Sequence, residues 1–120
     1  MWIFTNTGFI SVVEPSLQDY RGKADMLLVR ARGPGEIESI FGKRFKVTKT
    51  PDRDYLFRAL IPRETVAEAV AKQVFRLDYG NFKNSIRKDR YHNACGRVWG
   101  AMFSYQEELS RPRNQKVWDF

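Results

Sequence analysis

The chain has 120 residues, of which 42% are apolar and 14% are aromatic. This length fits one domain, and the apolar share excludes a disordered chain. The formal net charge of +7 favours an acidic partner, such as nucleic acid or an acidic protein surface.

The N-terminal third of the sequence predicts three β-strands. Residues 2–5 and 9–14 are aromatic and β-branched runs on either side of Asn6-Thr7-Gly8, which indicates a hairpin in which Gly8 takes a positive φ. A polar loop follows, and residues 25–32 form the third, central strand. Side chains alternate between the faces of a strand. One face of this strand should carry Leu27, Val29 and Ala31, and the other Met26, Leu28, Arg30 and Arg32.

The middle of the chain predicts a short helix and two more strands. The helix begins near Gly33-Pro34-Gly35, and Gly42 suits its exit. Residues 43–50 alternate apolar and polar side chains, which is typical of an edge strand protected by lysine. Residues 55–61 predict the next strand, with Tyr55, Phe57, Ala59 and Ile61 on one face.

Two further helices are expected in the C-terminal half. The capping-box pattern Thr65-Val66-Ala67-Glu68 predicts where the first begins. Its buried face should carry Val66, Val70, Val74 and Leu77. A short helical turn around Lys83 leads to a long helix over residues 89–109. Its buried stripe is expected to contain Tyr91, Cys95, Val98, Trp99, Met102, Gln106 and Leu109. Residues 110–120 form a basic tail in which Trp118 and Phe120 are apolar enough to dock.

This order of elements predicts an α+β fold. The third strand and the elements after it match a ferredoxin-like βαββα unit, which the N-terminal hairpin extends. We expect a five-stranded antiparallel sheet in the spatial order 1-2-3-5-4, with helices on one face and a long C-terminal helix. Residues 1–109 should form a single domain.

Several short motifs resemble those of a group of short bacterial or mobile-element proteins. The shared segments are Met-Trp-Ile-Phe-Thr, Gly-Phe followed by Ser-Val-Val, Leu-Leu-Val-Arg-Ala-Arg, Asp-Tyr before a strand with arginine, Asp-Tyr-x-Asn-Phe-Lys, and Tyr91, Val98, Trp99 and Met102 in the last helix. The resemblance covers roughly residues 1–106. It implies a compact cytosolic domain and assigns no activity.

The main candidate site is a basic set on the central strands and around the last helix. Directly opposed residues of neighbouring strands lie ~5 Å apart, so Arg30 or Arg32 should meet Arg58. Such a meeting indicates an anion or phosphate site, or equally an ion-pair network with Asp54, Asp78 or Glu14. The whole set comprises Arg30, Arg32, Arg58, Lys83, Arg87, Lys88 and Arg90.

Three other patterns have a functional and a structural interpretation. The loop with Asp78, Tyr79 and Asn81 suits a ligand, or simply ends one helix and caps the next. Aromatic residues among arginines can stack unpaired bases, although Trp2, Phe4, Phe9, Tyr55 and Phe57 fit a core better. Gly33-Pro34-Gly35 before a helix can receive a phosphate, but it is a weak signal alone.

Enzymatic and metal chemistry have little support in the sequence. His92 and Cys95 lie three residues apart on a helix that should bury Cys95, and a buried cysteine is usually inert packing. One cysteine and one histidine exclude a four-ligand Cys/His zinc site. No apolar run approaches the ~20 residues that span a bilayer, and the first residues do not form a signal peptide.

The sequence therefore predicts a cytoplasmic binding module, with no catalytic residues, cofactor, metal or membrane partner. Nucleic acid or a nucleoprotein is the favoured partner. The first alternative is a protein-interaction module or homodimer, such as an inhibitor of another bacterial complex, with an apolar patch around Met26, Leu28, Leu56 and Leu60. The second is an enzyme for a small anion, with a pocket that gathers Asp78, Tyr79, His92 and the arginines.

Overall fold

A computed structural model describes residues 1–111 of the chain, which form two compact units that we describe separately. The first unit is Met1–Gly80 and the second begins at Asn81. The single domain expected over residues 1–109 stays a prediction. The docking expected of Trp118 and Phe120 lies outside the described residues.

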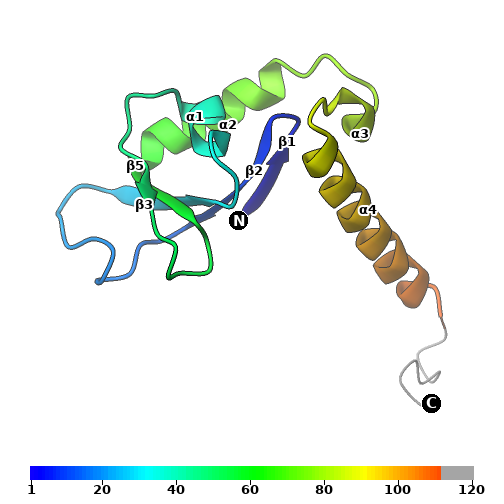
Figure 1. Ribbon diagram of the computed structural model, residues 1–120, viewed down its shortest axis with the longest axis horizontal. Coiled ribbons are helices and arrows are strands. Elements are labelled where there is room, and N and C mark those ends of the chain that lie inside the picture. The colour runs from blue at the N-terminus through cyan, green and yellow to red at the C-terminus, as the bar shows by residue number, and fades with distance from the viewer. Residues whose placement is uncertain (112–120) are drawn as a thin grey trace. The chain divides into compact units, whose positions relative to one another are not determined.

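The first unit contains one sheet and two helices (Figure 1). The sheet is antiparallel in the order β1-β2-β3-β5-β4, which confirms the predicted α+β topology. Helices α1 and α2 pack against one face and enclose a core that includes Ile10, Val29, Ile37 and Ile61. The elements are β1 (Trp2–Thr5), β2 (Gly8–Val13), β3 (Met26–Ala31), α1 (Glu36–Phe41), β4 (Thr48–Lys49), β5 (Phe57–Pro62) and α2 (Arg63–Phe75).

The hairpin between β1 and β2 differs from the prediction at Gly8. Gly8 pairs with Thr5 as the first residue of β2, and its φ is not positive. The Thr5 hydroxyl group donates to the Gly8 carbonyl oxygen at 2.9 Å and accepts from the Gly8 amide at 3.2 Å. Glycine is needed here for space, because a Cβ atom would lie 2.8 Å from Cγ of Glu36.

Glu36 joins two separate segments through its carboxylate group. Its Oε2 atom accepts from the Phe9 amide at 3.0 Å, and its Oε1 atom accepts from the Gly33 amide at 2.7 Å. The anion position expected at Gly33-Pro34-Gly35 is therefore occupied by the chain's own carboxylate. The Gly33 amide is therefore not available to a phosphate group, which argues against the phosphate site predicted in this loop.

We expect Gly8→Ala to lower the free energy of unfolding by about 2 kcal/mol, because the methyl group displaces Glu36 from both amides. Urea denaturation measures this loss. In a Glu36→Gly background the Cβ and Cγ atoms that cause the clash are both absent, so the same substitution at Gly8 should cost much less. Equal costs in the two backgrounds would contradict the proposed clash.

Two predicted strands are shorter than the alternation indicated. β4 spans only Thr48–Lys49, because Phe45 and Val47 pack against the core without ladder hydrogen bonds. β5 begins at Phe57, so the alternation of that strand does not extend to Tyr55. Tyr55 is buried against Arg30, Arg32 and Phe9, which places it away from the face where Phe57, Ala59 and Ile61 lie.

Helix α2 begins two residues before the predicted cap at Thr65. Pro62 precedes its first residue, and no side chain caps the helix. Arg63 instead fixes this end of the helix: its Nε atom donates to both carboxylate oxygens of Asp25, at 2.8 and 2.9 Å, and its Nη2 atom pairs with Glu14. Val66 is buried as expected, whereas Val74 and Leu77 are exposed, so the predicted buried face ends near Val70.

The second unit contains α3 (Phe82–Ser85) and α4 (Asp89–Leu109). Asn81 caps α3 by accepting from the Asn84 amide at 3.0 Å. The bounds of α4 confirm the prediction, but its expected buried stripe is wrong beyond Cys95. Val98, Trp99, Met102 and Leu109 are exposed, at 40%, 56%, 57% and 67% of their surface.

Candidate anion-binding face of the sheet

One row of paired residues crosses all five strands on the face opposite α1 and α2. Trp2 pairs with Ser11, Ser11 with Arg30, Arg30 with Arg58, and Arg58 with Thr48. We call this surface the arginine face and define it by Trp2, Ser11, Arg30, Arg58 and the neighbouring Arg32. The predicted meeting of Arg30 and Arg58 is thus a direct cross-strand pair.

Each arginine of this face donates to a different acceptor atom. The Nη2 atom of Arg58 donates to Oδ1 of Asp54 at 2.8 Å, and Nη2 of Arg30 donates to the Ser11 hydroxyl oxygen at 2.8 Å. Nη1 of Arg32 donates to the backbone carbonyl oxygen of Asp54 at 2.9 Å. The expected ion-pair network is therefore only partly formed: Asp54 pairs with Arg58, while Glu14 pairs with Arg63 elsewhere.

The Tyr55 ring contacts the guanidinium groups of Arg30 and Arg32. The Cζ atoms of Arg30 and Arg32 lie 4.4 and 4.1 Å from its centroid. Phe9 stacks on the same ring, with 6.5 Å between the centroids. Cation–π contact favours a guanidinium group over an aromatic face. Tyr55 therefore compensates in part for the repulsion between cations, a task that a carboxylate usually performs.

Positive charge on this face exceeds the negative charge available to it. Two like charges directly opposite each other in a sheet are destabilising. Within the described residues, the buried Nε atoms of both Arg30 and Arg58 have no hydrogen-bond acceptor. Arg58 is only 6% exposed. Burial lowers the pKa of Arg58, and neighbouring Arg53 lowers it further, although an arginine remains charged at neutral pH.

An open cavity of about 350 Å³ adjoins Arg58. Lys46, Arg53 and Arg58 contribute cationic groups to its wall, and Thr48 contributes a hydroxyl group. The Thr50 hydroxyl group also lies in this wall, but it donates to the Tyr55 carbonyl oxygen at 2.8 Å. Asp19 is the acidic residue of this wall, and it pairs with Nη1 of Arg53 at 2.7 Å. Cations and hydroxyl donors suit a phosphate oxygen, so the cavity extends the anion-binding character of the arginine face.

Asp19 also anchors the loop between β2 and β3. The hydrogen bond from Arg53 holds the pKa of the Asp19 carboxyl group below its ordinary value, with a further contribution from Ser16. A lowered pKa in the folded state stabilises the protein above the ordinary pKa of aspartate, and this contribution disappears as the pH falls through the lowered pKa. The apolar side chain of Leu17 does not anchor the loop, because it is 75% exposed.

We therefore expect Asp19→Asn to lower the urea midpoint more at neutral pH than near pH 3. Asp52→Asn, at an exposed position of the neighbouring turn, is the matched control. A loss for Asp19→Asn that is equally large at both pH values would contradict a role for its charge.

Aromatic side chains continue the arginine face toward β1. Trp2 is 69% exposed, so the expectation that it belongs to the core is wrong. Phe9 contacts Trp2 edge-to-face, with 5.7 Å between centroids, and Phe4 at 4.5 Å. Phe57 packs against the core as expected. Sequence reasoning missed Ser11, Asp19 and Arg53 as residues of this site, although Arg53 lies in the turn just before the predicted strand at residues 55–61.

The remaining predicted cations lie in the second unit. Arg87, Lys88 and Arg90 are exposed at the junction of α3 and α4. Nζ of Lys83 lies 4.6 Å from the Trp99 ring centroid, within the same unit. These residues form a second basic surface, separate in the sequence from the arginine face.

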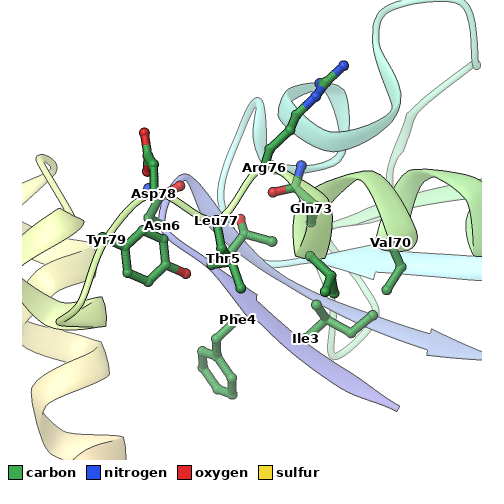
Figure 2. A pocket seen from close by; sticks show the side chains of 11 residues that line it. Ile3, Phe4, Thr5, Asn6, Val70, Gln73, Arg76, Leu77, Asp78 and Tyr79 are labelled. Carbon is green, nitrogen blue, oxygen red and sulfur yellow. The ribbon is translucent and has the colours of Figure 1, made fainter.

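The predicted ligand loop divides between the two units. Asp78 and Tyr79 line a cavity of about 390 Å³ between β1 and the end of α2, whereas Asn81 caps α3 (Figure 2). Ile3, Val70 and Leu77 make part of the wall apolar, and Arg76 extends away from them. Arg30, Arg32 and Arg58 do not line this cavity. This cavity therefore does not bring the arginines together with Asp78 and Tyr79, as the enzyme hypothesis expected.

The apolar patch predicted on the sheet around Met26, Leu28, Leu56 and Leu60 is only partly exposed. Leu28 itself is 5% exposed, and Met26, Leu56 and Leu60 are partly buried.

Cys95 is buried in α4, in agreement with a packing role. Across residues 1–111, no group of three or more His, Cys, Asp or Glu residues could hold a metal ion. In the same part of the chain, no helix combines the length and the apolar character needed to cross a membrane.

Comparisons with known proteins return no matching family model, curated protein or solved structure. The resemblance drawn from the short sequence motifs stays a prediction. The case for a function therefore rests on the geometry of the arginine face.

Proposed function

We propose that the protein is a non-enzymatic module that binds single-stranded nucleic acid on the arginine face. The observation that carries this proposal is the cross-strand row in which exposed Trp2 is followed by Ser11 and the opposed pair Arg30 and Arg58. Aromatic side chains stack unpaired bases, and arginines bind the phosphate backbone.

The arrangement favours a flexible strand over a duplex. Trp2 and Arg58 are separated by three strand-to-strand spacings, or roughly 14 Å across the sheet. A single strand can place a base on Trp2 and a phosphate group beside Arg58, Arg53 and Lys46. In a duplex the bases are stacked inside and cannot reach an aromatic platform. The exposed cations Arg87, Lys88 and Arg90 add electrostatic attraction from the second unit.

Fluorescence anisotropy with a labelled ~12-nucleotide single strand, and with the matching duplex, tests the proposal. We expect tighter binding of the single strand. The logarithm of its affinity should fall linearly with the logarithm of the salt concentration, with a slope of roughly −0.7 for each phosphate contacted.

Two results would overturn the proposal. One is the lack of binding to single-stranded DNA or RNA at low salt. The other is equal binding of polyglutamate of the same charge, which would show capture of any polyanion without stacking of bases. Binding to an acidic protein surface would then become the better explanation of the arginine face.

A further inference from the structure

The cavity beside Arg58 is built by segments that are distant in the sequence. β3 and β5 contribute Leu28, Arg58 and Leu60, the loop between β2 and β3 contributes Asp19, and the segment that leads into β4 contributes Lys46. The volume of about 350 Å³ lies near the lower end of the range of ~300–1,000 Å³ that is typical of small-ligand pockets. The cavity therefore has room for one small ligand, such as the end of a larger molecule.

Two cations of the wall are not fully compensated. Lys46 forms no ion pair within residues 1–111. Arg58 is only 6% exposed, and it donates from Nη2 to Asp54, while its buried Nε atom has no acceptor in the described part of the chain. Unpaired positive charge in a partly enclosed site favours an anionic ligand.

The balance of charge in the wall indicates which phosphate group fits. The wall contains three cationic side chains and one carboxylate group, from Lys46, Arg53, Arg58 and Asp19. Outside the wall, Asp54 pairs with Arg58 and Arg30 lies opposite it, so these two charges offset each other. A phosphodiester inside a strand carries one negative charge, whereas a phosphate monoester carries about −1.5 to −2 at neutral pH. The excess of positive charge therefore matches a monoester better than a diester.

We propose that this cavity binds the terminal phosphate monoester of a single strand, so that the protein recognises a strand end. The inference rests on the proposed binding of single-stranded nucleic acid and names the part of the strand that is recognised. Lys46 provides an ammonium group without a carboxylate partner, and Thr48 provides a hydroxyl donor. A 5′-phosphate and a 3′-phosphate carry the same charge, so the experiment compares the two ends.

Competition anisotropy with unlabelled strands of ~12 nucleotides tests the preference for an end. The competitors share one sequence and carry a 5′-phosphate group, a 3′-phosphate group, or hydroxyl groups at both ends. We expect one phosphorylated strand to bind about tenfold more tightly than the hydroxyl strand, because the monoester adds charge-assisted hydrogen bonds. Equal affinity of all the competitors would overturn the inference and leave the proposed function in place.

Two lysines near β4 separate this cavity from general electrostatic attraction. Lys46 lines the cavity, whereas Lys49 pairs with Phe57 and lies on the face of the strand opposite to Thr48. Both lysines are exposed, so replacement by alanine should keep the fold. Lys46→Ala should reduce the gain from the terminal phosphate to less than about twofold, and Lys49→Ala should leave it unchanged. A gain that survives Lys46→Ala would overturn the assignment to this cavity.

Mononucleotides test the cavity without a strand, so the inference stays testable even if no strand binds. At equal ionic strength, thymidine 5′-monophosphate or 3′-monophosphate should raise the urea midpoint more than the 3′,5′-cyclic diester of thymidine does. The base and the sugar are the same in all of them, and only the ester differs. Lys46→Ala should abolish the difference. Equal effects of the monoesters and the diester on the unmodified chain would overturn the inference.

Discussion

Trp2→Ala combined with Arg32→Ala is expected to weaken the binding of a single-stranded oligonucleotide about fiftyfold. Loss of one stacked base costs about a factor of ten, and loss of one phosphate contact a further factor of about five. Both side chains are exposed, and neither is in the core cluster, so the variant should keep its fold. Anisotropy titrations at fixed salt measure the loss.

The two single variants separate stacking from charge. Arg32→Ala should reduce the salt slope by about 0.7, since it removes one phosphate contact, while Trp2→Ala should leave the slope unchanged. The same slope change in both variants would contradict distinct roles.

Two exposed residues away from the arginine face serve as matched controls. The Cζ atom of Arg44 lies 4.7 Å from the Phe45 ring centroid, so it also combines a cation with an aromatic partner. Phe75, at the end of α2, is 89% exposed. Replacing either by alanine should change the affinity less than about twofold. A large loss in these controls would show that binding does not depend on the arginine face.

Asp54→Ala is expected to lower the free energy of unfolding by about 2 kcal/mol. The Asp54 carboxylate group accepts from both Arg58 and the Tyr55 amide, at 2.8 and 2.9 Å. Without it, a buried guanidinium group opposite Arg30 loses its carboxylate partner. Asp54→Asn keeps an oxygen acceptor in place, so it should lose less than half as much. Urea denaturation of the two variants compares them.

Inorganic phosphate should partly rescue Asp54→Ala. Its oxygens can occupy the position that the carboxylate group leaves, so the urea midpoint of this variant should rise with phosphate more than that of the unmodified chain. Chloride at equal ionic strength is the control for general screening. Equal effects of the two salts would argue against an anion position beside Arg58.

The sheet could be predicted from the sequence because β3 and β5 carry clear alternation and the turn between β1 and β2 is short. The contact of Arg30 with Arg58 followed from that topology. Tyr55 was assigned to the wrong face because the alternation continues in the sequence past the point, at Phe57, where β5 begins. The edge strand was predicted too long for a related reason. Phe45 and Val47 pack against the core, which produces the same alternation of apolar and polar residues as a hydrogen-bonded strand does.

The C-terminal helix shows a different limit of sequence reasoning. The spacing of Val98, Met102 and Leu109 correctly indicates an apolar face, but spacing alone does not tell what covers that face. The anchor of the long loop was missed for lack of any local signal. Asp19 and Arg53 are 34 residues apart in the sequence and meet only in the folded chain.

The sheet order also bears on how quickly the protein folds. β1, β2 and β3 are consecutive in the sequence and neighbours in the sheet. β5 pairs with β3 although α1 and β4 lie between them in the sequence. Arg30 and Arg58 therefore first meet when this longer loop closes, and their repulsion opposes that event. Dissolved phosphate or a polyanion would shield the two charges at that moment, so a ligand of the finished sheet would also accelerate its assembly.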